Sequence, residues 1–394
     1  MGSYRWKQGG IDMDTKKKAL MKKAGTVVGI LALVLIFNNL TNGAFASQRN
    51  LVILLKQSAV LMILTSSLMM ILIEKNIDLS GGAGVYLTGT LCALMIVKAG
   101  VSIYMAIPLT LIIGVLMGAI NGFFIGYIGL PAFIVTLAAQ QVFRGIGYTL
   151  TNCATVGPMP KNFTAISEAF IPPYFSVMLV IVIFVLFSIA NIRKYKQMGE
   201  WYGGKTKLIE NIAVACIAAI ILSWMFLGYR GCPMAVVIAV IVAEIAYLIT
   251  TKTVYGRQVY LIGGNIEATK LAGINTVKRV FQSYLFEGLM YGIAGIVLTA
   301  RLGGAASTGG NLLELDAVAA SCIGGVSMTG GVGTVLGAAC GVVILTAIDN
   351  IMSLMNISSY LQMVIKGIVL LMAVCLDLYA NKGKLRFKLL NSKK

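Results

Sequence analysis

Twelve long apolar runs, separated by short polar connections, constrain the fold of this 394-residue chain more than any other feature. A helix that spans a membrane needs about 20 mostly apolar residues. Hydrophobic residues make up 58% of the sequence and charged residues only 12%, which is too little charge to cover a water-facing surface of this size. The sequence therefore predicts an all-α, polytopic helical membrane protein with about twelve transmembrane helices. The runs lie at 24–40, 51–73, 82–98, 101–125, 131–150, 174–190, 208–228, 232–250, 280–300, 316–332, 333–355 and 360–379.

The positive charge is gathered in four segments, which sets the expected topology. Residues 1–23, 191–210, 251–279 and 380–394 together hold 23 of the 32 lysines and arginines. Basic segments next to spanning helices stay in the cytoplasm, so both termini are expected there. We also expect these basic segments to be attracted to anionic membrane lipid. We expect no binding of nucleic acid. The chain divides into a basic tail 1–23, one transmembrane domain 24–379 and a basic tail 380–394. The sequence Ala44-Phe45-Ala46 before Ser47 also fits a cleaved signal peptide, which stays an alternative for the first run.

The residue inventory excludes several kinds of active site. The chain has no histidine, and its seven cysteines include no pair within four residues of each other. Histidine-based catalysis, CxxC redox centres and zinc motifs are therefore excluded, and we expect no metal and no cofactor. Residues 199–206 spell a nucleotide-binding P-loop, but they join two membrane helices and no strand precedes them. We expect no enzymatic activity in this chain, and any ATP hydrolysis belongs to another subunit.

A few polar residues interrupt the apolar runs and are candidates for a solute pathway. Charged and amide side chains at membrane depth are costly, so they are functional candidates by default. The proposed pathway residues are Asn121, Gln140, Gln141, Asp349 and Asn350. Glu244, Glu287, Lys366 and Arg144 also lie within apolar runs, with Glu244 and Glu287 close enough to helix ends to reach the interface.

Glycines form two stripes and one dense segment. Gly114, Gly118, Gly122 and Gly126 repeat every four residues, as do Gly333, Gly337 and Gly341, and such stripes let helix backbones pack closely. Residues 303–341 contain eleven glycines. Glycine at this density breaks helices, so we expect a broken or re-entrant helix near the translocation pathway. The runs 131–150 and 316–332 are the least typical of a full span.

Four segments together resemble one known family. They are Ile77-Asp78-Leu79-Ser80-Gly81-Gly82, GLPAFIVTLA at 129–138, YGRQVYLIGGNIEATKLAGI at 255–274 and ELDAVAASCIGGVSMTGGVGTVLGAACG at 314–341. This pattern resembles the membrane permease of bacterial ABC importers for monosaccharides, over roughly residues 50–380. The apolar pair at about 208–250 resembles the xylose or multiple-monosaccharide subgroup. Gly81 departs from the valine that is more usual in the family.

The resemblance implies a mechanism and partners. The permease would work in the bacterial cytoplasmic membrane with a second permease copy, an ATP-binding subunit and an extracytoplasmic sugar-binding protein. The loop 251–279 resembles the coupling segment, with Gly256 and Arg257 near its start. Glu267, Ala268 and Gly273 match the spacing of the family's docking motif, with Thr269 in place of its usual alanine. A short helix that starts near Glu267 and ends at Gly273 is expected.

Other functions remain open from the sequence. A related ABC permease for a nucleoside or an autoinducer would share the same features. A secondary transporter driven by protons or sodium would need acidic residues deep in several helices, and Asp349 fits that requirement best. An intramembrane enzyme would need convergent acids, a thiolate with a base or a metal cluster, and the sequence indicates none of these. The sequence does not identify the sugar.

Overall fold

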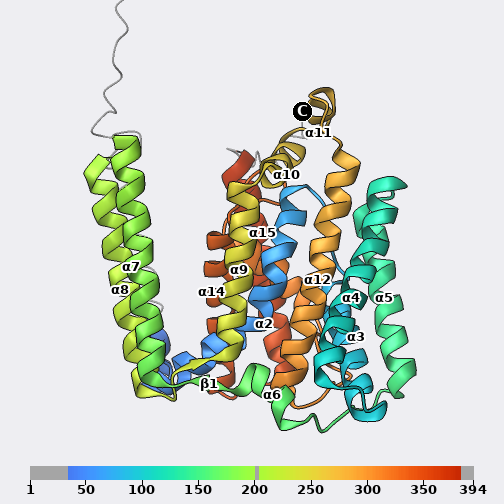
Figure 1. Cartoon of the computed structure of the whole chain (residues 1–394), viewed down its shortest axis with the longest axis horizontal. Helices are drawn as coiled ribbons and strands as arrows, with labels where there is room; N and C mark the ends of the chain where they lie inside the picture. Colours follow the sequence, from blue (N-terminus) through green and yellow to red (C-terminus); the bar gives the residue numbers. More distant parts are fainter. Residues whose placement is uncertain (1–33, 200–203, 383–394) are drawn as a thin grey trace, which may run out of the picture.

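The computed structural model describes residues 34–199 and 204–382, and most of these are helical. Residues 34–40 are helical, and a bundle of long helices follows (Figure 1). The helices are α2 (Gln48–Ile73), α3 (Gly81–Ala93), α4 (Ile103–Gly122), α5 (Ala132–Thr151), α6 (Lys161–Glu168), α7 (Pro173–Met198), α8 (Gly204–Gly228), α9 (Met234–Lys252), α10 (Val254–Gly264), α11 (Ile266–Leu271), α12 (Thr276–Leu302), α13 (Leu313–Ile323), α14 (Val335–Leu354) and α15 (Ser359–Lys382). Two π-helical turns, η1 (Leu94–Lys98) and η2 (Phe123–Tyr127), extend α3 and α4, and two short strands, β1 (Phe170–Ile171) and β2 (Cys232–Pro233), pair antiparallel.

The all-α membrane fold is confirmed. Eight of the described helices are long and apolar enough to cross a membrane, and the apolar part of α15, Ser359–Cys375, is shorter. The run 131–150 forms one unbroken helix, α5. The Gly-rich run 316–332 is broken, as its glycines predict, because α13 ends at Ile323 and residues 324–334 are not helical. The apolar run 24–40 lies partly outside the described residues.

Glycine conformation explains why α13 stops. Gly325, Gly330 and Gly331 have φ values of +83°, +84° and +74°, in the left-handed region that side-chain-bearing residues rarely adopt. An 11-residue helix is about 16 Å long, roughly half the hydrocarbon thickness of a membrane. The Gly-rich segment therefore contains a short helix followed by an irregular stretch, in which Val326 and Ser327 are buried and Val332 is exposed.

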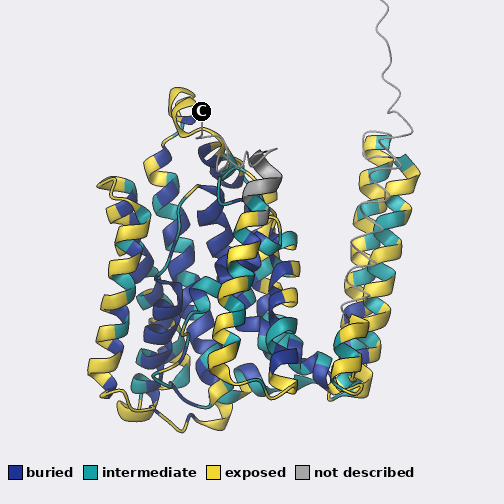
Figure 2. Cartoon of the chain, turned by 180° about the vertical axis from the view of Figure 1, so that it is seen from behind, coloured by how far each residue is buried: buried dark blue, intermediate teal, exposed yellow. Residues whose placement is uncertain are grey.

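Helix α2 lies at the centre of the bundle and is surrounded by other helices. Its second half, from Ser58 to Ile73, is almost completely buried, with α9, α12, α13 and α14 packed around it. Figure 2 shows this buried interior in dark blue, with exposed residues on the outer helices. A helix that is apolar on all sides is stable only in such a position or in lipid.

The first predicted glycine stripe brings α4 and α12 into contact. A Cβ built on Gly118 would lie 2.1 Å from the Tyr284 carbonyl oxygen, and one on Gly114 would lie 2.4 Å from the Gly288 carbonyl oxygen. Neither position has room for a side chain, so the two backbones touch. The close-packing prediction is confirmed for this stripe.

The second stripe does the same for α13 and α14. A Cβ on Gly341 would lie 1.9 Å from the Ala320 carbonyl oxygen, and one on Gly337 would lie 2.2 Å from the Gly324 carbonyl oxygen. Gly333 lies in the irregular stretch before α14. The short helix α13 is thus held against α14 by backbone contact.

The hairpin of α7 and α8 stands apart from the rest of the bundle (Figure 1). Only a small part of either helix is buried. Of the predicted helix pair at about 208–250, α8 packs along α7, whereas α9 packs on the central helix α2. The pair that stands apart is therefore α7–α8, and it joins the body mainly through β1, β2 and the start of α2.

Candidate coupling segment and polar sites

The segment between α9 and α12 folds into two short helices whose ends are capped by the sequence. Thr253 accepts a hydrogen bond from the Gly256 amide at the start of α10, at 3.0 Å. Asn265 accepts one from the Ala268 amide at the start of α11, at 3.1 Å. Gly273 follows the last residue of α11 with a φ of +78°. The predicted short helix near Glu267 is confirmed, and its stop comes from glycine geometry.

Most of the predicted coupling residues lie on an exposed surface. Arg257, Glu267, Ala268 and Gly273 are exposed, and Leu271 beside them is 90% exposed. Glu267 pairs with Lys270 at 3.1 Å, on the same side of α11. An exposed apolar side chain flanked by charges is typical of a surface that a partner covers.

Gly256 differs from the other coupling residues because it is buried. A Cβ at this position would lie 2.3 Å from the Ile249 carbonyl oxygen and 2.4 Å from the Thr250 carbonyl oxygen. Gly256 therefore lets α10 turn back closely against the end of α9. The structure gives it a packing role beside the exposed surface.

The end of α10 is joined to the core by backbone contacts. A Cβ on Gly263 would lie 1.7 Å from the Ile73 carbonyl oxygen, at the end of α2. The Gly331 amide, in the irregular stretch after α13, donates to that same oxygen at 2.9 Å. The Tyr260 hydroxyl donates to the Gly333 carbonyl at 2.9 Å. The coupling segment thus touches both the central helix and the broken segment 324–334, which together form what we call the backbone joint (Gly263, Ile73 and Gly331).

A second connection runs through side chains. The Tyr255 hydroxyl of α10 lies 2.6 Å from the Ser283 hydroxyl of α12, and Ser283 donates to a Glu74 carboxylate oxygen at 2.7 Å. Glu74 is buried at the end of α2. A movement of α10 would therefore displace groups on both α2 and α12.

A buried polar network holds the extended chain between α2 and α3. Asp78 accepts hydrogen bonds from the Ser80 amide and the Ser80 hydroxyl, both at 2.7 Å, and from the Tyr291 hydroxyl. Asn121 of α4 donates to the Ser80 hydroxyl at 2.9 Å. The network joins α3, α4 and α12 around one carboxylate, and Asn121 is a structural member of it.

Glu287 of α12 lies fully inside the bundle, which corrects the expectation that it could reach the interface. Ser67 of α2 lies next to the Glu287 carboxylate. Within the described residues, neither Glu287 carboxylate oxygen has a well-aligned hydrogen bond. Glu244, by contrast, is exposed on α9. A buried carboxylate at membrane depth is costly.

Helix α5 is fastened to the Gly-rich segment by two polar side chains. Gln140 donates to a Glu314 carboxylate oxygen at 2.7 Å. One turn further along, Arg144 donates to the Gly309 carbonyl at 3.0 Å and lies over the Tyr86 ring at 5.1 Å. These contacts fix the entrance to α13. The sequence indicated Gln140 and Arg144 but gave no signal for Glu314.

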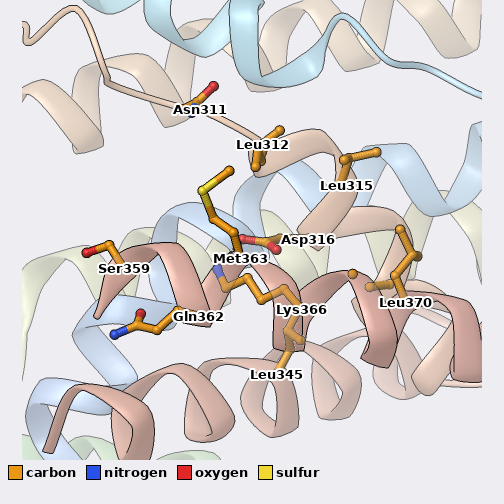
Figure 3. Close-up of a pocket in the computed structure, with 12 residues that line it drawn as sticks. Asn311, Leu312, Leu315, Asp316, Leu345, Ser359, Gln362, Met363, Lys366 and Leu370 are labelled. Atoms are coloured by element: carbon orange, nitrogen blue, oxygen red, sulfur yellow. Dashed lines mark hydrogen bonds and ion pairs between the residues drawn. The ribbon is translucent and has the colours of Figure 1, made fainter. Parts of the chain in front are cut away.

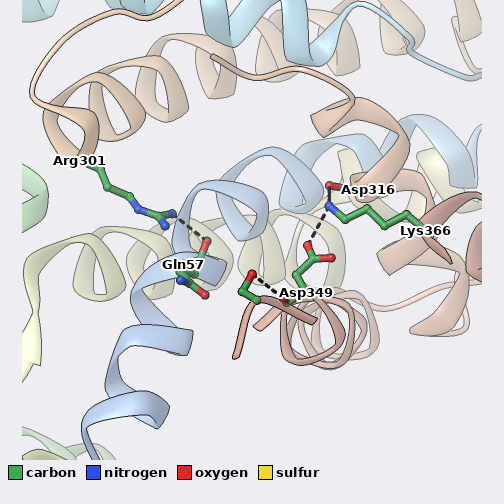
Figure 4. Close-up of polar contacts among 6 residues, drawn as sticks. Gln57, Arg301, Asp316, Asp349 and Lys366 are labelled. Atoms are coloured by element: carbon green, nitrogen blue, oxygen red, sulfur yellow. Dashed lines mark hydrogen bonds and ion pairs between the residues drawn. The ribbon is translucent and has the colours of Figure 1, made fainter. Parts of the chain in front are cut away.

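Three charged side chains meet between α13, α14 and α15. The Lys366 ammonium lies 2.8 Å from an Asp316 oxygen and 2.9 Å from an Asp349 oxygen (Figure 4). All three side chains are half-buried, and they come from three different helices. We call this group the lysine triad. The sequence identified Lys366 and Asp349 as unusual charges, but it did not identify Asp316.

The lysine triad borders a cavity of about 200 Å³ (Figure 3). Lys366, Asp316, Gln362, Asn311 and Ser359 supply its polar groups, and leucine and methionine side chains supply the rest. It is a weakly polar cavity beside the Gly-rich segment.

The five predicted pathway residues do not gather in one place. Asn121 is in the Asp78 network, Gln140 holds Glu314, and Asp349 belongs to the lysine triad. Gln141 is exposed on α5. Asn350 is buried and exchanges amide hydrogen bonds with Asn50 of α2, at 2.8 and 3.0 Å. In the described residues, no three His, Cys, Asp or Glu side chains are arranged as metal ligands.

Comparison with known proteins identifies the class. Eight of the described helices could span a membrane, and a family model described as "Branched-chain amino acid transport system / permease component" matches residues 50–374. The chain belongs to this family, among the permease subunits of bacterial sugar ABC importers. No solved structure gives a significant match.

Several curated permeases match almost the whole chain. It is 36% identical over 354 residues to the xylose transport system permease of Escherichia coli K12, which covers 89% of this chain and 90% of that protein. It is 34% identical over 362 residues to the xylose permease of Haemophilus influenzae, covering 91% and 96%. It is 31% identical over 358 residues to the ribose import permease of Bacillus subtilis, covering 91% and 93%.

Proposed function

We propose that this chain is the translocation subunit of an ATP-driven importer that carries a monosaccharide across the cytoplasmic membrane by alternating access. The solute is a pentose or hexose, with xylose as the first candidate. The observation that carries this proposal is the 36% identity to a xylose permease over nearly the full length of both proteins. Both termini and the α10–α11 surface face the cytoplasm.

The ATP-binding subunit docks on the exposed surface of α10 and α11. Arg257 and Glu267 supply charged contacts there, and Leu271 supplies an apolar one. Ala268 has a small side chain and Gly273 has none, so the ATP-binding subunit can approach the α11 backbone closely. The backbone joint and the Tyr255–Ser283–Glu74 chain pass the resulting movement to α2, α12 and the segment 324–334.

The solute passes along the Gly-rich segment of two permease copies. Gln140 and Asp349 lie on either side of α13, and the cavity beside the lysine triad offers hydrogen-bond donors and acceptors to a hydroxylated solute. An extracytoplasmic binding protein supplies most of the recognition. Asn121, Gln141 and Asn350 are further candidates, of which the two buried residues act by holding the helices that line the path.

An ion-coupled secondary transporter is the competing function, because buried carboxylates are present. Glu287 and Asp78 lie fully inside the bundle. Such a transporter would move solute with a proton or sodium gradient and without ATP. A nucleoside or autoinducer permease would instead keep the ATP requirement and change the solute.

The test is uptake by the purified complex in liposomes. The chain is isolated in mild detergent with whatever subunits accompany it and is reconstituted with its binding protein. Labelled xylose, ribose and a nucleoside are then offered with ATP inside, and separately with an ion gradient alone. We expect uptake of xylose only with ATP. Uptake that follows the ion gradient in the absence of ATP would overturn the proposal.

Docking is tested separately by two charge-removing variants. Arg257→Gln and Glu267→Gln should reduce the amount of ATP-binding subunit that copurifies. Lys161→Gln is the matched control, because Lys161 is an exposed basic residue at the start of α6, outside the segment 251–279. Equal retention of the subunit by all three variants would contradict the assigned docking surface.

A further inference from the structure

A second cavity lies where the α7–α8 hairpin joins the body of the bundle. Its volume is about 260 Å³, and it is lined by α2, the end of α6, β1, the turn after α8 and the end of α12. It is at the opposite end of the molecule from α11 (Figure 1). The residues that matter here are Lys56, Gln57, Glu168, Phe170, Arg230 and Arg301, and we call this space the junction cavity.

The junction cavity has an excess of positive charge. Three of its lining residues are cations, Lys56, Arg230 and Arg301, and one, Glu168, is a carboxylate. Glu168 pairs with Lys56. Arg301 also interacts with the Glu168 charge, and Arg230 is exposed at the edge of the cavity. One carboxylate faces three cations, so the lining is positive, and positive charge at a membrane surface attracts anionic lipid.

The two arginines are positioned but not saturated. Arg301 donates only to the Gln57 carbonyl, at 3.4 Å (Figure 4), and four of its five N–H groups have no such bond within the described residues. Arg230 makes no hydrogen bond there, and its guanidinium carbon lies 4.9 Å from the centre of the Phe170 ring. It sits in a turn with a φ of +47°, followed by Gly231 at +91°. The backbone is thus bent to place this guanidinium over the ring at the cavity.

The cavity lies at the depth of the membrane surface. Four of the most exposed aromatic side chains stand at this end of their helices: Tyr104 at the start of α4, Tyr174 at the start of α7, Trp224 in the last turns of α8 and Tyr360 at the start of α15. Exposed tyrosine and tryptophan gather at the level of lipid headgroups. The hairpin also leaves apolar faces of α7 and α8 uncovered above the cavity, where acyl chains can lie.

We propose that the junction cavity binds the phosphate group of an anionic glycerophospholipid. Arg230 and Arg301 donate to the phosphate oxygens, because the planar guanidinium fits this group in a two-point contact. The second Glu168 oxygen, which is buried and has no hydrogen-bond partner in the described residues, accepts from a headgroup hydroxyl. The acyl chains fill the space between the hairpin and the body. The lipid thereby fastens the hairpin to the bundle, independently of which solute the protein carries.

The experiment measures lipid binding by the full-length protein after exhaustive detergent washing. Phosphatidylglycerol, phosphatidylcholine or inorganic phosphate is added back, and the melting temperature and the retained phospholipid are followed as functions of concentration. Wild-type protein should be stabilised by phosphatidylglycerol at much lower concentration than by phosphatidylcholine, and inorganic phosphate should have little effect. Arg230→Gln and Arg301→Gln should each weaken the phosphatidylglycerol effect about tenfold.

Two controls keep the result specific. Arg49→Gln removes an exposed arginine from the start of α2, outside the cavity, and should bind phosphatidylglycerol like wild type. Arg230→Lys keeps the charge but loses the two-point contact, and should fall between wild type and Arg230→Gln. Equal binding by wild type and both glutamine variants would overturn the proposal. So would an equal response to inorganic phosphate, or arginine variants that lose only an acidic extracytoplasmic protein and retain the lipid.

Discussion

Replacing Gly263 by alanine is the sharpest test of the link between the coupling segment and the core. The new Cβ would lie 1.7 Å from the Ile73 carbonyl oxygen and 2.5 Å from the Gly331 amide nitrogen, where real Cβ contacts lie beyond 3.0 Å. The end of α10 must therefore move away by more than 1 Å. That movement separates the three parts of the backbone joint.

The cost follows from two terms that act in the same direction. Forcing a methyl group into a packed contact costs about 1–3 kcal/mol. Straining the Gly331 amide bond to Ile73 costs about 1 kcal/mol more. The higher helix propensity of alanine returns up to about 1 kcal/mol. We expect Gly263→Ala to destabilise the protein by about 1–3 kcal/mol and to reduce solute-stimulated ATP hydrolysis by the assembled complex.

The adjacent glycine is the matched control. Gly264 is also in the last turn of α10, and a Cβ built on it meets no atom within 4 Å. Gly264→Ala should be as stable as wild type or slightly more stable, with normal ATP hydrolysis. Thermal unfolding in detergent and ATPase assays on both variants decide the matter. If the two variants lose the same stability and activity, the backbone joint is not a tight contact and the reasoning is refuted.

Three further substitutions test the packing and polar contacts by thermal unfolding of the purified chain. Gly118→Leu should destabilise the protein by about 1–3 kcal/mol, because the new side chain pushes α4 away from α12. Gly145→Ala, at an open position on α5, should leave the stability unchanged. Equal stability of the two variants would disprove the close contact between α4 and α12. Lys366→Met should lower the stability by about 1–3 kcal/mol, because it leaves two half-buried carboxylates without their cation. Lys366→Arg should keep most of the wild-type stability. A methionine variant as stable as wild type would show that the lysine triad does not contribute to stability. Asn50→Ala and Asn350→Ala should each lower the stability by about 1–3 kcal/mol. The double variant should lose less stability than the sum of the two single variants. Strict additivity would mean that the two amides are not coupled.

The helices were predictable because hydropathy and glycine spacing act locally. Apolar runs of spanning length placed most helices correctly, and the stripe from Gly114 to Gly126 predicted a backbone contact that the structure confirms. The break in the Gly-rich run 316–332 was predictable as well, because dense glycine disfavours a helix. The exact end at Ile323 was not, since it depends on which glycines adopt left-handed φ values.

The polar sites were less predictable, because their partners come from distant parts of the chain. Lys366 and Asp349 are conspicuous in apolar runs, but their third partner, Asp316, lies in a segment that also reads as a helix start. Asn350 pairs with Asn50, 300 positions earlier, and nothing in the sequence indicates that pairing. Sequence shows which polar groups need a partner, and only the packing of helices decides which partner each one finds.

The length of the α7–α8 hairpin sets how far it projects from the membrane. The two helices have 26 and 25 residues, so they are about 39 and 38 Å long, whereas the 19 residues of α9 span about 29 Å. The hydrocarbon core is about 30 Å thick, so the hairpin has roughly 9 Å to spare. Arg193, Lys194 and Lys196 near the end of α7 belong in water, which places that overhang on the side of α11 (Figure 1). The ends of α7 and α8 therefore project from the membrane on the same side as the α10–α11 surface. They would project further from a thinner bilayer and less far from a thicker one.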